Sequence, residues 1–460
     1  MDYKDSEVTA VRLACYLSGF IAPLLSTMMN LSLVNIGEEF GTGSHDLAYI
    51  NSAFLLASVI FMVPFAKLSD IIGKKMMFII GLQILVAGCV VASISPSFWW
   101  IIIGRAIIGA GAASMATVSI SLLTDVVPKE HRGSAMGYQT MFVYMGLALG
   151  PAIGGTLNDL IGWRLLFLLP LPLAVASILI LKFRFKTDIA ADRNGILDTR
   201  GSVLYGLAVL FSMAGVMNLP NTWAIASLVA GLILLVLFIR SQRNNEHCIL
   251  DISLFRIWAF SGSCIATFMS YAASFSVSFF MALYLQSIGQ LSATQAGLLM
   301  IIQPVIQCFF TPFVGKLTDR LERKAVLPTL GMIITGIGIL TLIFYDMNTT
   351  LETVMVTMLL IGFGFALFSA PNTTLIMSSV PKTHTSEASG MMAVMRQTGM
   401  MVSMGIAMLF ISTIMGSMDN LGPDTYGLFL EVMKYSFSVC FVMCIVGAVT
   451  SAVRGTPKKF

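Results

Sequence analysis

Apolar residues occur in long runs along the whole chain, and short polar segments separate one run from the next. Each run is about 20 residues long, which is the length an α-helix needs to cross the hydrocarbon core of a bilayer. The runs lack strict apolar and polar alternation, which favours helices over the strands of a membrane barrel. The pattern predicts about fourteen spans, at residues 13–36, 47–66, 76–95, 98–123, 136–158, 163–182, 201–218, 223–240, 258–286, 295–315, 325–345, 353–379, 388–416 and 425–451.

The composition agrees with a chain that lies mostly in lipid. Hydrophobic residues make up 57% of the 460 residues and charged residues only 11%, whereas a soluble domain carries roughly 25% charged residues. The 39 glycines and 15 prolines would weaken soluble helices, but membrane helices tolerate them and use small residues for close packing. We therefore predict an all-α polytopic membrane protein and not a soluble enzyme.

The basic residues divide the loops into two classes, which predicts the orientation. If the loops alternate between two sides, the side that holds the N-terminus also holds nearly all of the 27 Lys and Arg residues. The exceptions are Arg105 and Arg396 within spans, and Arg164 and Lys434 near the other side. We expect a plasma-membrane protein with both termini in the cytoplasm. The net charge of +4 is spread over short loops, so nucleic acid is not an expected partner.

Two pairs of loops repeat at nearly the same interval. Residues 67–75 resemble residues 316–324, with their aspartates 319 − 70 = 249 positions apart. Residues 127–131 resemble residues 380–384, with their prolines 381 − 128 = 253 positions apart. The interval covers eight spans, and both copies of each loop lie on the same side. A duplicated half of six spans, with two extra spans between the copies, explains this pattern as parallel repeats.

The duplication predicts three parts of the chain. Residues 1–183 form an N-terminal six-helix bundle, and residues 258–460 form a C-terminal six-helix bundle. Residues 184–257 contribute two inserted transmembrane helices with cytoplasmic linkers.

Several motifs lie in this framework. The loop from Ala66 to Lys75 resembles the pattern Gly-x-Leu-x-Asp-Arg-x-Gly-Arg-Lys, with Ala66 in place of the first Gly and Ile71 in place of the first Arg. The fourth span carries Arg105 with Gly109 and Gly111. The fifth span carries a glycine-rich run with one proline, made of Gly146, Gly150, Pro151, Gly154 and Gly155.

Together these motifs resemble the major facilitator superfamily, and most closely its fourteen-helix drug:proton antiporter family, over essentially the whole chain. The resemblance implies two six-helix bundles that move substrate by alternating access. It also implies a cytoplasmic gating motif at Asp70, Gly73, Lys74, Lys75, Gly315, Asp319 and Arg320. The glycine-rich fifth span corresponds to the antiporter signature of the superfamily.

Each motif also has a purely structural interpretation. Asp70 either accepts hydrogen bonds at a neighbouring helix N-terminus, as part of a latch between the halves, or belongs to a solvated turn beside headgroup-bound cations. The face of Gly146, Gly150 and Gly154 either seals the halves during gating or simply allows close packing. Arg105 either faces a cavity or snorkels to an interface. If it is buried, we expect Asn30 and Gln139 to be its partners.

The predicted interior is poor in acid. The first span of the family usually carries an aspartate that is associated with proton coupling, and Leu25 stands at that position here. The predicted substrate and proton pathway is instead neutral or cationic, formed by Thr27, Asn30, Gln139, Gln303, Gln307, Asn372, Arg105 and Arg396. Asn51 and Gln83 are further neutral residues of the interior. With 31 Met and 31 Phe in the chain, such an interior suits amphipathic, neutral or anionic compounds better than dications.

The sequence thus predicts a secondary active transporter, with proton-coupled efflux of drugs or amphipathic small molecules as the first hypothesis. The alternatives are a facilitator or uptake carrier of a small metabolite, or a membrane sensor that keeps the fold without transport. No enzyme activity, cofactor or metal is expected, because neither a nucleotide-binding loop nor a cluster of His and acidic residues is visible. The expected partners are protons, a small molecule and the bilayer, and the chain is expected to be a monomer.

Overall fold

The computed structural model describes residues 4–454, except 30–32, 42–43, 191–194, 220, 244, 246–247, 292, 322 and 417–422. Within these limits the chain is helical and contains no strand. Thirteen helical segments of the described part are long and apolar enough to cross a membrane. The remaining predicted span, 136–158, lies within α6 (Arg132–Ile161). The all-α polytopic fold predicted from the apolar runs is confirmed.

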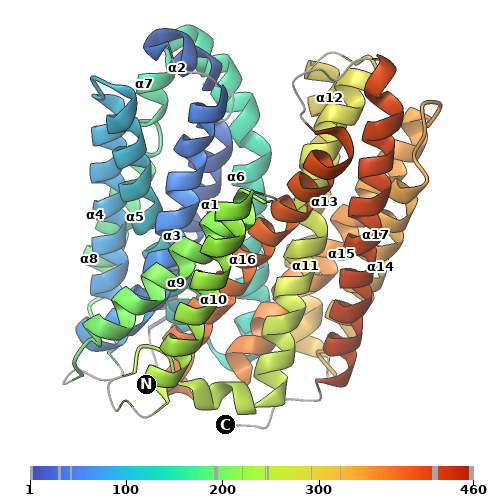
Figure 1. Ribbon diagram of the computed structural model, residues 1–460. Coiled ribbons are helices and arrows are strands. Elements are labelled where there is room, and N and C mark those ends of the chain that lie inside the picture. The colour runs from blue at the N-terminus through green and yellow to red at the C-terminus, as the bar shows by residue number, and fades with distance from the viewer. Residues whose placement is uncertain are drawn as a thin grey trace. The chain divides into compact units, whose positions relative to one another are not determined.

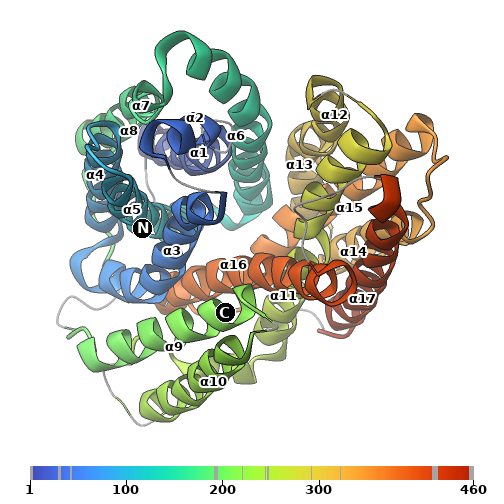
Figure 2. The same cartoon turned by 45° about the horizontal axis from the view of Figure 1, so that its top comes forward.

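The chain divides into two compact units, and the first contains residues 1–206, 238–252 and 380–394. Figure 1 shows its long helices in blue to green. They are α1 (Asp5–Met28), α2 (Leu33–Phe40), α3 (Ser44–Ile72), α4 (Lys74–Ser93), α5 (Phe98–Val126), α6, α7 (Trp163–Leu166) and α8 (Leu171–Arg184). Figure 2 shows α1 enclosed between α6 and the helices α5 and α8, which are its principal contacts.

Small residues set the distance between the helices of this unit. A Cβ atom at Gly88 of α4 would lie 2.6 Å from the backbone nitrogen of Ile108, and one at Gly111 of α5 would lie 2.5 Å from that of Leu85. Such contacts are too short for a side chain, so glycine lets the two backbones touch. α5 also contacts α3 and α1, which places it at the centre of the unit.

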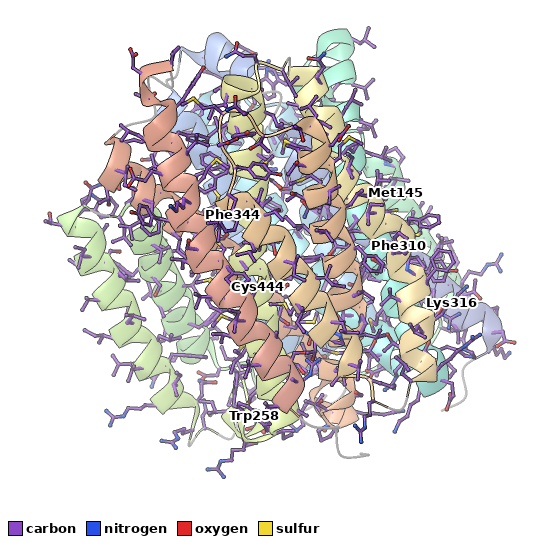
Figure 3. The ribbon with its side chains drawn as sticks, turned by 90° about the vertical axis from the view of Figure 1, so that its right-hand side faces the viewer. Met145, Trp258, Phe310, Lys316, Phe344 and Cys444 are labelled. Atoms are coloured by element: carbon purple, nitrogen blue, oxygen red, sulfur yellow. The ribbon has the colours of Figure 1, made fainter. Side chains whose placement is uncertain are left out.

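The second unit contains residues 207–237, 253–379 and 395–460. Besides residues 207–237, it holds α11 (Trp258–Leu283), α12 (Ala293–Met300), α13 (Ile302–Arg320), α14 (Val326–Ile343), α15 (Leu351–Ser378), most of α16 (Thr385–Phe410) and α17 (Tyr426–Val453). Phe280, Phe429 and Phe437 pack together in the core between α11 and α17. Figure 3 shows Cys444 midway along α17 and Trp258 at the lower end of the helices.

The helix pairs repeat from one half of the chain to the other. α3 and α4 each pack on α5, as α13 and α14 each pack on α15, and α1 packs on α8 as α11 packs on α17. Two further helices, α9 (Thr199–Met217) and α10 (Thr222–Gln242), stand between the halves in sequence. The structure therefore has the predicted parallel repeat with an inserted helix pair.

Candidate functional site

Arg105 is fully buried on α5, with no exposed surface. Its Nε donates to the carbonyl oxygen of Ile50 at 3.2 Å, and its Nη2 donates to Oδ1 of Asn51 at 3.0 Å. The guanidinium carbon lies 4.7 Å from the centre of the Phe54 ring, within the range of a cation–π contact. Nη1 is buried without a hydrogen-bond partner among the described residues. Arg105 is therefore an interior cation held by neutral groups, and it does not snorkel.

Of the two expected partners of Arg105, Gln139 does not bind it. Asn30 lies outside the described residues. Gln139 lies on α6 beside Gly19 of α1, where a Cβ at Gly19 would be 2.6 Å from its Nε2. Arg105 instead points toward α3, which packs along α5. There it meets the Ile50 carbonyl, the Asn51 amide and the Phe54 ring. Asn51 thus takes the place predicted for Gln139.

The glycine face of α6 contacts α1. A Cβ at Gly146 would lie 2.5 Å from the carbonyl oxygen of Phe20, and one at Gly150 would lie 1.8 Å from Oγ1 of Thr27. Gly154 makes a similar approach to the backbone of α1. The predicted close packing is present, and its partner helix belongs to the same compact unit. Pro151 and Gly155 lie within the bounds of α6 but outside the residues whose surroundings are described.

The polar candidates of the second unit are either buried or half-buried. Gln307 is buried on α13, and Gln303 is half-buried one turn earlier. Asn372 is buried on α15, where its amide nitrogen donates to the carbonyl of Ser263 at 3.2 Å and to Oγ1 of Thr267 at 2.8 Å. Arg396 is half-buried on α16.

A charged network lies at the other end of α5, within the first unit. Asp70 is 3% exposed and accepts a hydrogen bond from the Ser386 hydroxyl at 2.5 Å. Lys74 is 1% exposed, and its Nζ contacts the Asp125 carboxylate and the Thr385 hydroxyl, the latter at 2.7 Å. Ser386 and Thr385 open α16, so this helix start is held by an acid of α3 and a cation of α4.

Two expectations about this motif need correction. Lys74 was expected at the lipid headgroups, but it is buried against Asp125 because α4 begins at Lys74 and directs that side chain toward α5. Asp70 was expected in a loop, but it lies in the last turn of α3, which continues to Ile72. Only Gly73 separates the two helices, with φ of 104°, a backbone conformation that only glycine adopts without strain.

Glu387 extends the network on the first turn of α16. Its Oε2 accepts from the backbone N–H of Asp251 at 2.9 Å. Its Oε1 lies 3.5 Å from Nδ1 of His384 and 4.0 Å from Nζ of Lys67. The His384 side chain is 31% exposed.

The linker after α8 covers the start of α4. The Asp188 carboxylate accepts from the backbone N–H groups of Lys75 at 3.0 Å and Met76 at 3.3 Å. The backbone N–H of Lys74 donates to the carbonyl of Ile189 at 2.8 Å. Burial raises the pKa of Asp188, and the hydrogen bonds from α4 oppose that rise. Asp188 thus accepts hydrogen bonds from N–H groups at the start of α4 that have no partner within the helix, although it lies more than a hundred residues further along the chain.

The second copy of the motif has different residues at the positions of the Lys74–Asp125 ion pair. Gly315 is buried and Asp319 is half-buried on α13, while Arg320 is exposed. The repeat interval 378 − 125 = 253 puts Ser378 at the place of Asp125. The interval 323 − 74 = 249 puts the exposed Arg323 at the place of Lys74. The buried ion pair is therefore a feature of the first half alone.

Replacing Asp70 with asparagine should impair transport while leaving the amount of folded protein near normal. The amide can still meet Ser386, so packing is kept, but the negative charge between Lys74 and the start of α16 is lost. Transport by purified protein in liposomes measures the effect, and Asp319→Asn should be milder. Full transport by Asp70→Asn would remove the main support for a latch.

An ion pair marks the end of the first unit opposite the charged network. Arg164 binds both carboxylate oxygens of Glu39, at 2.7 and 2.8 Å. Trp163 donates from its indole N–H to the same carboxylate at 2.9 Å, and the guanidinium lies 4.3 Å from the Trp163 ring. These contacts fix the short helix α2 against α7. Arg164 holds the pKa of Glu39 below its usual range.

This lowered pKa predicts how the pair responds to pH. The pair stabilises the fold above the ordinary pKa of a glutamate, and this contribution is lost as the pH falls through the lowered value. The side chains are 39% and 41% exposed, so solvent screens the pair and the effect is modest. We expect the melting temperature of Glu39→Gln to fall less on acidification than that of the wild type. An exposed control, Glu130→Gln, should follow the wild type, and an identical pH response of Glu39→Gln would contradict this prediction.

No group of three His, Cys, Asp or Glu side chains in the described part of the chain could hold a metal ion. The site residues consist of a buried cation with neutral partners and a charged network at helix ends. The buried cation can bind polar groups of a solute. The charged network at the helix ends can break and reform its hydrogen bonds and ion pairs.

The sequence profile of the Major Facilitator Superfamily matches residues 15–245 and 263–459. The riboflavin transporter RibZ of Clostridioides difficile (strain 630) is 24% identical, over 79% of this chain and 79% of its own length. The multidrug resistance protein Stp of Mycobacterium tuberculosis (strain CDC 1551 / Oshkosh) is 26% identical, over 84% of this chain and 73% of its own length. The solved structure of the proton:xylose symporter XylE superposes with a TM-score of 0.70 at 15% identity, covering 97% of this chain and 95% of that one. The chain is therefore a multi-pass membrane transporter that belongs to the major facilitator superfamily.

Proposed function

We propose that this transporter exports amphipathic small molecules in exchange for protons, working as a monomer in the plasma membrane. The observation that carries the proposal is Arg105, a fully buried cation whose described partners are all neutral and whose Nη1 has no partner among the described residues. A buried charge is costly to maintain, so its presence in a transporter points to a solute that it binds.

The charge of Arg105 sets the substrate class. Leu25 is fully buried at the position where the family usually carries an aspartate, so no acid there balances the cation. A permanently positive group attracts anionic or electron-rich groups and repels dications. We infer that neutral or anionic amphipathic compounds are the substrates, and that Thr27, Asn30, Gln139, Gln303, Gln307, Asn372 and Arg396 complete the pathway.

The proposal of export coupled to protons is supported by the fifth predicted span and by one of the relatives. The glycine run on α6 matches the antiporter signature of the superfamily, and Stp is named for multidrug resistance. We propose that the Asp70–Ser386 contact acts as the latch that breaks and reforms in each cycle. In this proposal, residues 1–183 and 258–460 form the two moving bundles, and residues 184–257 contribute the inserted pair.

The orientation can be tested by reporter fusions. Fusions after residues 190, 250 and 455 should all report the cytoplasm, and a fusion after residue 220 should report the outside, because the basic loops stay inside. Alkaline phosphatase and green fluorescent protein reporters read the two sides independently. A cytoplasmic signal after residue 220 would remove the inserted pair as membrane spans.

The alternative function is uptake or facilitated movement of a metabolite, which the riboflavin transporter RibZ and the symporter XylE illustrate. A sensor that does not transport is the second alternative. Purified protein in liposomes, given an amphipathic anionic dye with and without an imposed pH gradient, separates the three. Accumulation driven by an acidic interior supports antiport, and accumulation driven by an acidic exterior supports proton-coupled uptake. Equilibration without a gradient effect supports a facilitator, and no movement of any dye supports a sensor.

A further inference from the structure

A buried arginine lies at one end of the second unit, next to Asn372 of the proposed pathway, and has no role in the sites described above. Arg454 follows the last turn of α17 and is 2% exposed. Its Nη1 donates to the Ser263 hydroxyl of α11 at 2.9 Å and to Oδ1 of Asn372 on α15. The side chain therefore reaches from the end of α17 into the corner where the three helices meet.

The charge of Arg454 is not compensated by the described part of the protein. Its Nε and Nη2 are buried without a hydrogen-bond partner. None of the ion pairs found among the described residues includes it. A buried guanidinium with two unused donors is costly unless an anion meets it.

The matching contacts of the first unit are made by neutral groups. The interval 372 − 253 = 119 relates Asn372 to Ser119 of α5. There, the Cys15 thiol of α1 contacts the Ser119 carbonyl at 3.6 Å, and Ser177 of α8 donates to the Ala14 carbonyl at 3.1 Å. All of these groups are neutral. The repeated architecture therefore does not explain why Arg454 is charged.

Two exposed residues flank the buried Arg454 at this end of the helices. α11 begins at Trp258, whose indole N–H donates to the carbonyl of Val453 at 3.3 Å. Trp258 is 49% exposed and Val453 is 63% exposed, and Figure 3 shows Trp258 at the lower end of the helices. Tryptophan favours the headgroup level of a bilayer, and the first turn of α11 adds the positive end of a helix dipole.

We propose that Arg454 and the start of α11 form a binding site for a phosphate group, supplied either by an anionic phospholipid or by a phosphate in solution. The free Nε and Nη2 form one edge of the guanidinium fork, which is suited to bidentate phosphate binding. Basic sites between membrane helices near the headgroups are a recurring place for anionic lipids. Ser263 and Asn372 hold only Nη1, so the donors of that buried edge stay unused among the described residues.

The test is thermal unfolding of the full-length protein in a neutral detergent, with increasing amounts of ligand. Phosphatidylglycerol or inorganic phosphate should raise the melting temperature, since a ligand of the folded state stabilises it, whereas phosphatidylcholine should have a much smaller effect. A shift with phosphatidylglycerol alone identifies a lipid site, and a shift with inorganic phosphate identifies a free-phosphate site. An equal response to phosphatidylcholine and phosphatidylglycerol, with none to inorganic phosphate, would overturn the proposal.

Variants locate the site. Arg454→Gln should need roughly tenfold or more ligand for the same shift, since it removes charge-assisted hydrogen bonds. Arg323→Gln, which removes an exposed arginine of the same unit, should respond like the wild type. If Arg454→Gln does not fold, Arg454→Lys keeps the charge without the fork and should bind roughly tenfold more weakly. Wild-type affinity in the folded variants of Arg454 would place the phosphate elsewhere.

Discussion

Replacing Arg105 with alanine should reduce transport roughly 100-fold or more, because it removes the buried cation that we propose to bind the substrate, and a hydrogen bond to a charged group contributes about 1.5–3 kcal/mol. The amount of folded protein should fall little. The removed side chain carries a buried N–H without a partner in the described structure, so its loss also relieves a cost. Uptake of an anionic dye into liposomes measures transport, and size-exclusion chromatography measures folded protein.

Arg105→Lys tests whether geometry or charge matters at this position. Nε and Nη2 point to different acceptors, Ile50 and Asn51, and an ammonium group cannot reproduce that fork. This variant should recover only part of the transport. Arg240→Gln, which removes an exposed arginine at the end of α10, is the control and should transport normally. Unchanged substrate affinity and transport in Arg105→Ala would make this residue purely structural.

Breaking the buried pair of Lys74 and Asp125 should have the second large effect. Removing one partner of a buried ion pair costs about 3–5 kcal/mol, because the other charge stays buried. Lys74→Met and Asp125→Leu should each lower the melting temperature strongly and abolish transport. Lys186→Met, at an exposed position of the linker, should leave both properties unchanged.

The double variant separates folding from function. With both charges replaced by apolar side chains, no unpaired charge remains, and the melting temperature should recover most of the loss. Transport should stay low, because Thr385 at the start of α16 loses both of its charged partners. Recovery of transport together with stability would mean that the pair only packs the fold and plays no part in the cycle.

The helices, their number and the repeat could be predicted from the sequence because each depends on local runs and on a fixed interval. The glycine face of α6 could be predicted for the same reason, since positions spaced by four residues share one side of a helix. The identity of its partner, α1, could not, because that depends on how distant helices pack.

Contacts between distant segments were harder to predict. Asp125 was placed just beyond a span that was expected to end at residue 123, whereas α5 continues to Val126. Because Asp125 was placed outside the span, it could not be predicted as the partner of Lys74. Asp188 gave no local signal, because it acts on the amides of α4 from a linker. Asn51 was recognised as an interior polar residue, but only the packing of α3 on α5 identifies it as the partner of Arg105.

The exchange of substrate for protons can be measured most directly with a pH-sensitive dye trapped inside liposomes that contain the purified protein. Adding an anionic amphipathic substrate outside, with no initial pH gradient, should raise the internal pH of wild-type liposomes, because protons leave as substrate enters, and should leave it unchanged with Arg105→Ala. A fall of the internal pH would show symport. A substrate that enters the liposomes at the wild-type rate without any change of internal pH would show a facilitator and would contradict proton antiport.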